Sequence, residues 1–244
     1  MFGDKLDWDI LAAAPPDVGP CHGIIALAGV TSGDLGLNTS LALAAIDLAH
    51  KTNCGPVLLT SSAAVYGRSQ DVMAEDSVCD PVTDYGRAKL AMERAIAVRL
   101  RDMGEAAPAV CTLRIGNVGG ADALLLAAGR NSVKLDQFDD GQGPERSYVG
   151  MLTLARIMMH LLGLATRLIA LPPVLNIAAP RPVPMSALLQ AAGLTWDWQP
   201  APSDALRRMV LDTTRLGALI STDPLSDDPA EIIRQARCAG WGPK

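Results

Sequence analysis

The chain has 244 residues, a formal net charge of −5, and 49% hydrophobic against 19% charged residues. This balance predicts a globular protein with a buried core and excludes a disordered chain. The acidic charge and the lack of any Lys/Arg run argue against binding to nucleic acid or to an acidic membrane surface. Asp4, Lys5, Asp7 and Asp9 disfavour a secretory signal at the start of the sequence, so we expect a cytoplasmic protein.

The five cysteines are scattered along the chain and include no C-x-x-C pair. This pattern favours a reduced, cytoplasmic protein over a disulfide scaffold or a zinc site. The three histidines have no cysteine or carboxylate partner at ligand spacing, so no metal site is expected. The apolar stretch Met151–Leu171 is interrupted by charged residues and followed by Pro172-Pro173. It therefore predicts an amphipathic helix and not a membrane span.

Short apolar runs alternate with helical spacing over the first 120 residues. Residues 23–29, 56–60 and 109–115 are apolar runs typical of buried parallel strands. The intervening residues 36–51 and 84–103 show the periodicity of helices. This alternation predicts right-handed crossovers between strands of one parallel sheet.

The alternation loosens after Gly119-Gly120, where residues 121–148 predict a lid or a substrate-side insertion. Further elements are expected at 149–164 (helix), 174–178 (strand), 184–192 (helix), 209–211 (strand) and 228–239 (helix). The prediction is an α/β fold with a doubly wound parallel sheet. Residues 1–120 and 149–180 would form its core, and residues 121–148 and 181–244 a small discontinuous substrate lobe.

Candidate catalytic residues lie at the start of the helix predicted over residues 84–103. Tyr85 and Lys89 are four residues apart and therefore share one helix face. An ammonium beside the phenol is expected to lower the tyrosine pKa from about 10 towards neutrality, where the group exchanges a proton readily. The hydroxyl of Ser62, at the end of a predicted strand, could hold an alcohol or carbonyl oxygen while that proton moves.

Other polar or small residues also follow predicted strands. Ala28-Gly29 ends the first apolar run, Ser61-Ser62 directly follows the second, and Asn117 lies two residues after the third. Open α/β sheets bind their ligands beyond the carboxyl ends of the strands. We therefore expect one active site at that edge of the sheet.

Several motifs occur in order between about residue 22 and residue 220. They are Ser61-Ser62-Ala-Ala-Val65-Tyr66-Gly67, Tyr85…Lys89, Leu113-Arg114-Ile-Gly-Asn117-Val118-Gly119, Arg146-Ser-Tyr148-Val149, Leu175-Asn176-Ile177-Ala178 and Leu211-Asp212-Thr-Thr-Arg215-Leu216. Together they resemble the extended short-chain dehydrogenase/reductase group, specifically the NAD-dependent epimerase/dehydratase family. Each motif alone would be a weak signal, but the ordered set is specific.

The resemblance implies a Rossmann-like sheet, a small-molecule substrate and NAD or NADP as the cofactor. It implies a catalytic set of Ser62, Tyr85 and Lys89. The implied cofactor-binding set is Leu27, Ala28, Gly29, Asn38 and Ser61, together with Tyr85 and Lys89. Asn117 and Arg146 match positions that bind the substrate, although a scaffold role is an equal alternative for both. A homodimer through helices 36–51 and 84–103 is also implied.

Two departures from the family pattern bear most on the function. The Gly-x-x-Gly-x-x-Gly strand that holds the dinucleotide pyrophosphate is missing. We therefore expect an N-terminally shortened form that lacks roughly two strands and leaves the strand at residues 23–29 on a bare edge. Ala63-Ala64 stands where sugar-nucleotide dehydratases carry an acid pair, which makes dehydration less expected than epimerisation or reduction.

The expected function is NAD(P)-dependent oxidoreduction at a carbinol carbon of a sugar or sugar nucleotide, as in an epimerase. One alternative is an aldehyde or ketone reductase that uses NADPH. Another is a catalytically inactive dinucleotide-binding or scaffold protein. Tyr66 is expected to pack in the core, and Arg114 is left open between an ion-pair residue and a ligand.

Overall fold

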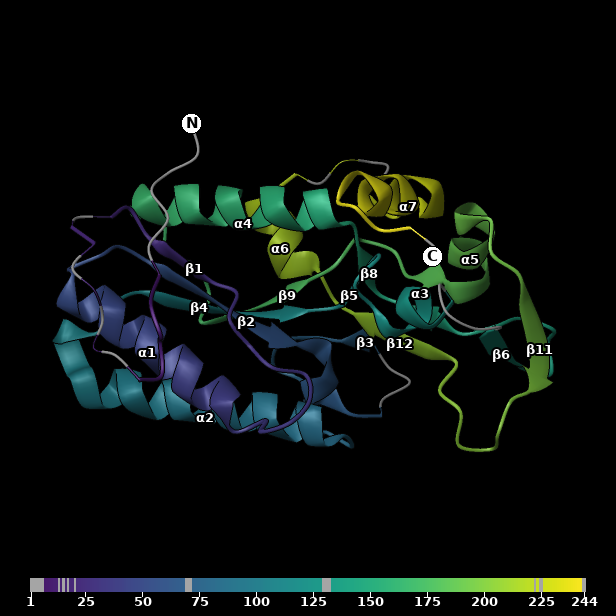
Figure 1. Ribbon diagram of the computed structural model, residues 1–244, viewed down its shortest axis with the longest axis horizontal. Coiled ribbons are helices and arrows are strands. Elements are labelled where there is room, and N and C mark those ends of the chain that lie inside the picture. Colours follow the sequence, from purple (N-terminus) through teal and green to yellow (C-terminus); the bar gives the residue numbers. More distant parts are fainter. Residues whose placement is uncertain are drawn as a thin grey trace.

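The computed structural model describes residues 7–12, 14, 16, 18–19, 21–68, 72–128, 133–221, 223 and 226–242. Its central sheet has four parallel strands in the order β1-β2-β4-β9 (Figure 1). These strands are β1 (Ile24–Ala26), β2 (Val57–Ser62), β4 (Val110–Ile115) and β9 (Val174–Ile177). The strands predicted at residues 23–29, 56–60, 109–115 and 174–178 are therefore confirmed, as is the α/β fold with its parallel sheet.

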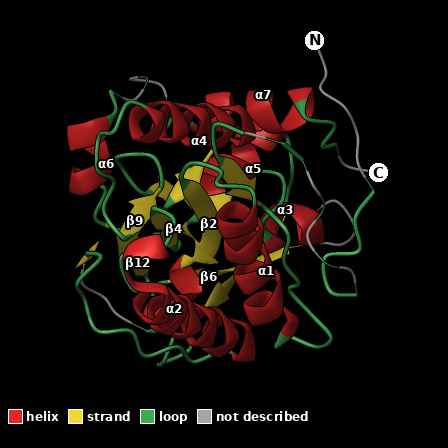
Figure 2. Cartoon of the chain, turned by 90° about the vertical axis from the view of Figure 1, so that its left-hand side faces the viewer, coloured by secondary structure: helices red, strands yellow, loops and turns green. Residues whose placement is uncertain are grey.

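Helices cover both faces of this sheet, as Figures 1 and 2 show from two directions. Helices α1 (Leu37–Lys51) and α2 (Asp84–Met103) pack together on one face. Helices α4 (Met151–Thr166) and α6 (Thr214–Leu219) lie on the other. The doubly wound arrangement is thus confirmed.

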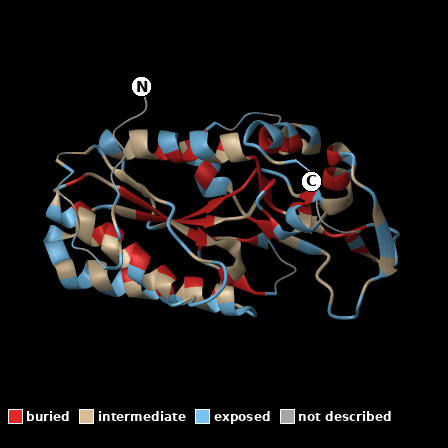
Figure 3. Ribbon diagram, viewed as in Figure 1, coloured by how far each residue is buried: buried red, intermediate tan, exposed pale blue. Residues whose placement is uncertain are grey.

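The strands are apolar on both sides because both faces of the sheet are covered. On β2, Val57 and Leu59 pack towards α1 and α2, whereas Leu58 between them packs towards α4. Figure 3 shows the buried residues gathered along the sheet and on the inner sides of these helices. With so few aromatic residues, the core is built from Leu, Ile, Val, Met and Ala.

The remaining elements lie beyond the carboxyl ends of the central strands. Four short strands form a second sheet in the order β10-β7-β12-β3, and two pairs, β11-β6 and β5-β8, stand apart from it. The strands are β3 (Val72–Met73), β5 (Asn117–Val118), β6 (Val133–Gln137), β7 (Glu145–Arg146), β8 (Tyr148–Val149), β10 (Val183–Pro184), β11 (Trp196–Pro200) and β12 (Arg208–Leu211). The helices are α3 (Ala123–Ala128), α5 (Met185–Ala192) and α7 (Pro229–Cys238), with the short 3-10 turn η1 (Ala63–Tyr66). A second 3-10 turn, η2 (Gly104–Ala106), follows α2 and lies at the opposite end of the sheet, before β4.

This part confirms the helices expected at 184–192 and 228–239 and the strand expected at 209–211. The stretch 121–148, expected as an insertion, contributes α3, β6 and β7. The division of the chain into a core and a substrate lobe stays a prediction.

Helix α4 confirms the helix expected at 149–164. Among the described residues, every helix is too short or too polar to cross a membrane. The cytoplasmic location stays a prediction.

Strand β1 forms one edge of the central sheet, and β2 is its only partner in the described part of the chain. Its three residues are half-buried, and Leu27 directly after it is exposed.

Cys21 and Cys54 form a disulfide that joins the segment before β1 to the turn after α1, with their Cα atoms 5.1 Å apart. The expectation of free thiols was therefore wrong for this pair. The sequence separation of 33 residues explains why spacing gave no signal. Cys79, Cys111 and Cys238 are free.

Replacing Cys21 with serine is expected to lower the free energy of unfolding by about 3 kcal/mol, since the cross-link restricts the unfolded chain across a long loop. Urea unfolding followed by circular dichroism measures this loss. Cys238→Ser, which changes an exposed free cysteine, is the matched control and should leave the midpoint unchanged. Equal midpoints for both variants would contradict the cross-link.

Candidate active site

The end of β2 and the start of α2 bring Ser62 and Tyr85 together. Thr83 caps α2, and its hydroxyl oxygen accepts a hydrogen bond from the Gly86 N–H at 3.0 Å. A Cβ atom at position 86 would lie 2.4 Å from the carbonyl oxygen of Ala64. Only glycine at this position lets the first turn of α2 approach η1 so closely, and Tyr85 is its neighbour.

The Ser62 hydroxyl has two neighbours. Its oxygen accepts a hydrogen bond from the Ala64 N–H at 3.2 Å, which caps η1. The Tyr85 phenol lines the same cavity as Ser62, and its interaction with Ser62 lowers the phenol pKa. The structure therefore places these two predicted catalytic residues at one cavity.

The pKa of Tyr85 is raised by burial, while the interaction of the phenol with Ser62 lowers it in part. The expected net lowering by Lys89 was therefore wrong for this geometry. The Lys89 ammonium lies 5.9 Å from the centre of the Tyr85 ring and donates a hydrogen bond to the Thr60 carbonyl at 3.0 Å. It is thus directed at the backbone of β2 and not at the phenol oxygen.

Lys89 is the most deeply buried of the three catalytic candidates, with 3% of its surface exposed. Burial lowers the pKa of its ammonium, and the negative charge of Glu93 raises it. A buried ammonium needs acceptors, and the hydrogen bonds to the Thr60 carbonyl and to the Met92 sulfur leave one N–H group for another partner.

A cavity of about 240 Å³ opens beside this group. Six predicted site residues line its wall: Leu27, Gly29, Ser61, Ser62, Tyr85 and Lys89. A Cβ atom at Gly29 would lie 3.4 Å from the Lys89 Nζ and 3.1 Å from the Asn38 Oδ1. Glycine therefore keeps the space beside the ammonium open. Ala28 is exposed and does not line the cavity.

Asn38 is buried, and its side-chain amide forms hydrogen bonds with the loop after β1. Its Oδ1 accepts from the Val30 N–H at 3.2 Å, and its Nδ2 donates to the carbonyls of Val30 and Leu35 at 2.9 and 3.1 Å. The residue thus shapes the loop that carries Gly29. A direct contact with a dinucleotide stays a prediction.

A second cavity, of about 180 Å³, shares Ser62, Ile115 and Gly116 with the first. Asn117 and Arg146, the predicted substrate residues, both line it. The Arg146 guanidinium donates hydrogen bonds to the carbonyls of Glu145, Leu206 and Arg207, at 2.8 to 3.1 Å. In this arrangement Arg146 ties β7 to the segment before β12, which is the scaffold role left open by the sequence.

A third cavity, of about 390 Å³, continues from the second and shares Ala64, Arg146 and Met209 with it. Arg68 and Asp204 lie on its wall and form an ion pair at 2.7 Å. The three cavities form a row that runs from the loop after β1, past Ser62, to the segment before β12.

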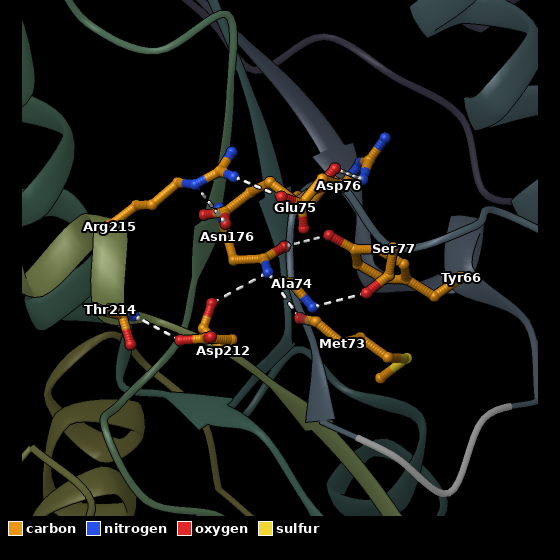
Figure 4. Close-up of polar contacts among 11 residues, drawn as sticks. Tyr66, Met73, Ala74, Glu75, Asp76, Ser77, Asn176, Asp212, Thr214 and Arg215 are labelled. Atoms are coloured by element: carbon orange, nitrogen blue, oxygen red, sulfur yellow. Dashed lines mark hydrogen bonds and ion pairs between the residues drawn. The ribbon is translucent and has the colours of Figure 1, made fainter.

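A polar network supports the wall of the second cavity (Figure 4). Tyr66 is buried, as expected, and its hydroxyl donates to the Asn176 Oδ1 at 2.7 Å. The Asn176 Nδ2 donates to the carbonyls of Met73 and Asp212 at 2.9 and 3.0 Å. One buried asparagine thus joins β9 to β3 and to the end of β12, next to the cavity residues Met73 and Leu211.

Sequence reasoning missed Glu93, which binds two of the residues at this site. Its carboxylate accepts a hydrogen bond from the Ser61 hydroxyl at 2.6 Å and pairs with Arg114 at 2.7 Å. Ser61 therefore uses its side chain within the protein. The available signal was spacing: Tyr85, Lys89 and Glu93 follow each other at intervals of four on one helix.

The fold and the site together define an oxidoreductase-like α/β protein with a Ser–Tyr–Lys group at the carboxyl ends of a parallel sheet. Residues 3–151 match the NAD dependent epimerase/dehydratase family. The match covers more than half of the sequence. The chain belongs to this family, and hence to a class of enzymes. Comparison of the sequence with curated proteins found no match.

Solved structures with this fold include three sugar-nucleotide enzymes. TunA, an NAD dependent NDP-hexosamine 5,6-dehydratase involved in tunicamycin biosynthesis, is 19% identical with a TM-score of 0.75, and 95% of this chain covers 81% of that one. The UDP-Glc/GlcNAc 4-epimerase of Campylobacter jejuni is 20% identical with a TM-score of 0.71, and the match covers 88% of this chain and 76% of that one. The UDP-glucose 4-epimerase of Brucella ovis, in complex with NAD, is 20% identical with a TM-score of 0.72, and the match covers 89% of this chain and 77% of that one. At these identities the likeness shows the fold.

Proposed function

We propose that the chain is an NAD(P)-dependent oxidoreductase that acts at a carbinol carbon of a nucleotide sugar, with epimerisation as the favoured outcome. The observation that carries the proposal is that Ser62, Tyr85 and the buried Lys89 line one cavity, next to a second cavity that Ser62 also lines. Similar structures are sugar-nucleotide epimerases and dehydratases, which supports this substrate class.

The residues fit the nicotinamide–ribose end of a dinucleotide. Gly29 leaves space beside the Lys89 ammonium, which has one N–H group left to donate to a ribose hydroxyl. Leu27 and Val118 supply apolar wall to the same cavity. The bound nicotinamide would serve as the hydride acceptor and donor. The sequence has no Gly-x-x-Gly-x-x-Gly segment, so we assign no residue to the pyrophosphate.

Tyr85 is the proposed acid and base. Its phenolate would accept the proton of the carbinol hydroxyl, and the Ser62 hydroxyl would donate a hydrogen bond to the same oxygen. Lys89 would stabilise the negative charge on Tyr85. In an epimerase Tyr85 returns the proton after the carbon has been reduced from its other face. Ala63-Ala64 provides no acid pair for a dehydration step.

A second candidate is an aldehyde or ketone reductase that uses NADPH. Two observations favour it. The second cavity is walled largely by apolar side chains, with Met73, Ile115, Met209 and Leu211 among them. The Arg146 guanidinium is also engaged with three backbone carbonyls, so it would need to leave them to bind a phosphate.

Ligand identification tests the proposal. We expect NAD or NADP among the small molecules released on denaturing the purified chain, or binding of the added dinucleotide in a titration. With UDP-glucose or UDP-N-acetylglucosamine and NAD, we expect formation of the 4-epimer, detected by chromatography. Oxidation of NADPH with simple ketones, without turnover of either nucleotide sugar, would favour the reductase. Neither binding nor turnover would refute both and favour a scaffold protein.

We also propose that α1 and α2 form the interface of a homodimer, because the family resemblance places a dimer contact on these helices. Sedimentation of the purified chain at several concentrations tests this proposal. A monomer at every concentration would refute it.

A further inference from the structure

Glu93 and Arg114 form a buried ion pair beneath the catalytic group. Their side chains are 8% and 7% exposed, and the Arg114 Nη2 lies 2.7 Å from the Glu93 Oε2. The Arg114 Nε also donates to both carboxylate oxygens, at 3.1 and 3.2 Å. This is a charge-assisted contact in which both partners have fixed orientations.

Arg114 is also held from its far side. Its Nη1 donates to the Glu75 carbonyl at 3.0 Å, and its guanidinium lies 4.8 Å from the centre of the Tyr66 ring. Tyr66 in turn is fixed by Asn176. The arginine therefore acts as a rigid support for the Glu93 carboxylate.

The Glu93 carboxylate makes one more contact, and this one leads to the site. The Ser61 hydroxyl donates to its Oε1 at 2.6 Å, and Ser61 directly precedes Ser62 on β2. Lys89 lies one turn before Glu93 on α2, so both residues face β2. Glu93 thus links the end of β2 to the helix that carries Tyr85 and Lys89.

The surroundings of Lys89 contain few groups that favour its charge. The titratable groups facing it from α2 are Tyr85 and Glu93, and β2 contributes the Thr60 carbonyl and the Ser61 hydroxyl. Met92 contributes its sulfur at 4.0 Å, and Arg114 approaches only behind Glu93. Among these groups, Glu93 is the one carboxylate.

We propose that Glu93, fixed by Arg114 and Ser61, is the positioning residue that keeps Lys89 in its ammonium form beside Tyr85 and holds the end of β2 against α2. The inference rests on the proposed function for its catalytic consequence. A purely structural role would not require a carboxylate, because well-packed apolar residues replace many buried ion pairs without loss of stability.

Glu93→Gln tests the inference because it removes the charge and keeps most of the shape. Burial lowers the Lys89 pKa and Glu93 raises it, so in the variant burial acts without opposition and the pKa falls further. Lys89 would then lose its proton at a lower pH. We expect the alkaline limb of the kcat profile to move down by about one pH unit.

The charge of Lys89 can be followed without turnover. The chain has five lysines, so the side-chain signals of isotope-labelled lysine are few enough to titrate by nuclear magnetic resonance, and Lys89→Arg identifies the relevant one. In Glu93→Gln this signal should titrate about one pH unit lower than in the original chain. Asp47→Asn is the matched control, because Asp47 of α1 pairs with Arg99 of α2 at an exposed position.

Two more variants protect the test against misfolding. Glu93→Asp retains the charge and should restore most of the Lys89 titration. Ser61→Ala leaves the ion pair intact and should move the titration in the same direction by less. An unchanged Lys89 titration in folded Glu93→Gln overturns the inference. A shifted titration in a protein without turnover supports the electrostatic role of Glu93 and counts against the proposed reaction instead.

Discussion

Tyr85→Phe is expected to lower kcat by a factor of about 10² to 10⁴, since it removes the group that accepts and returns the proton. The change deletes one oxygen and little contact area, so the affinity for the dinucleotide should remain within about twofold. Steady-state kinetics together with a dinucleotide titration measure the two effects separately.

Tyr66→Phe is the matched control for this prediction. It deletes the same atom from a buried tyrosine that bonds to Asn176 and lies outside the first cavity. It should cost about 1 kcal/mol of stability and leave the chemical step nearly unchanged. If Tyr85→Phe retained activity within tenfold, a difference of about 1.4 kcal/mol in the barrier, Tyr85 would not be the acid and base.

Arg114→Met is expected to lower the free energy of unfolding by about 3 to 5 kcal/mol, because it leaves the Glu93 carboxylate buried without its partner. Urea unfolding followed by circular dichroism measures the loss. The double variant Glu93→Gln/Arg114→Met should recover much of it, since no uncompensated charge remains.

The control for this second effect is Arg99→Met on α2. Arg99 and Asp47 pair at 2.6 Å, but their side chains are 43% and 44% exposed, so this loss should be only about 0.2 to 1 kcal/mol. If both arginine variants lost the same free energy of unfolding, burial would not make the Glu93–Arg114 pair more important for stability than an exposed pair.

Helix α2 shows how far local chemistry predicts the fold. Its observed bounds, Asp84 and Met103, coincide with the predicted ones. Thr83 supplies the N-terminal cap, and Gly104, with φ of +56°, ends the helix. The strands of the central sheet were equally visible because strands covered on both faces are continuously apolar.

Elements whose stability comes from distant partners were missed. Strand β11 has the mixed sequence Trp-Asp-Trp-Gln-Pro and exists through its pairing with β6, some sixty residues earlier. Helix α6 is short, and its buried Leu216 packs into the core beneath α4 and β9. Neither segment has apolar residues at a helical or strand spacing that would identify it from the sequence alone.

The sequence predicted which residues form the candidate site better than it predicted their pKa values. The resemblance named Ser62, Tyr85 and Lys89, and the structure brings them together. The direction of the Tyr85 pKa depended on where the Lys89 ammonium points, and the Thr60 carbonyl that attracts it belongs to the backbone. The Glu93–Arg114 pair joins residues 21 positions apart, which no local pattern reveals.

The Cys21–Cys54 bond closes a covalent ring that contains β1, the loop with Gly29 and all of α1. Leu27, Gly29, Val30 and Thr31 of the first cavity lie inside this ring, whereas Tyr85 and Lys89 lie outside it. The cavity is therefore bounded by a cross-linked unit on one side and by a helix anchored through Glu93 on the other. The strand before the cavity loop and the helix after it are therefore covalently tied to each other, whereas α2 meets this unit only through non-covalent contacts.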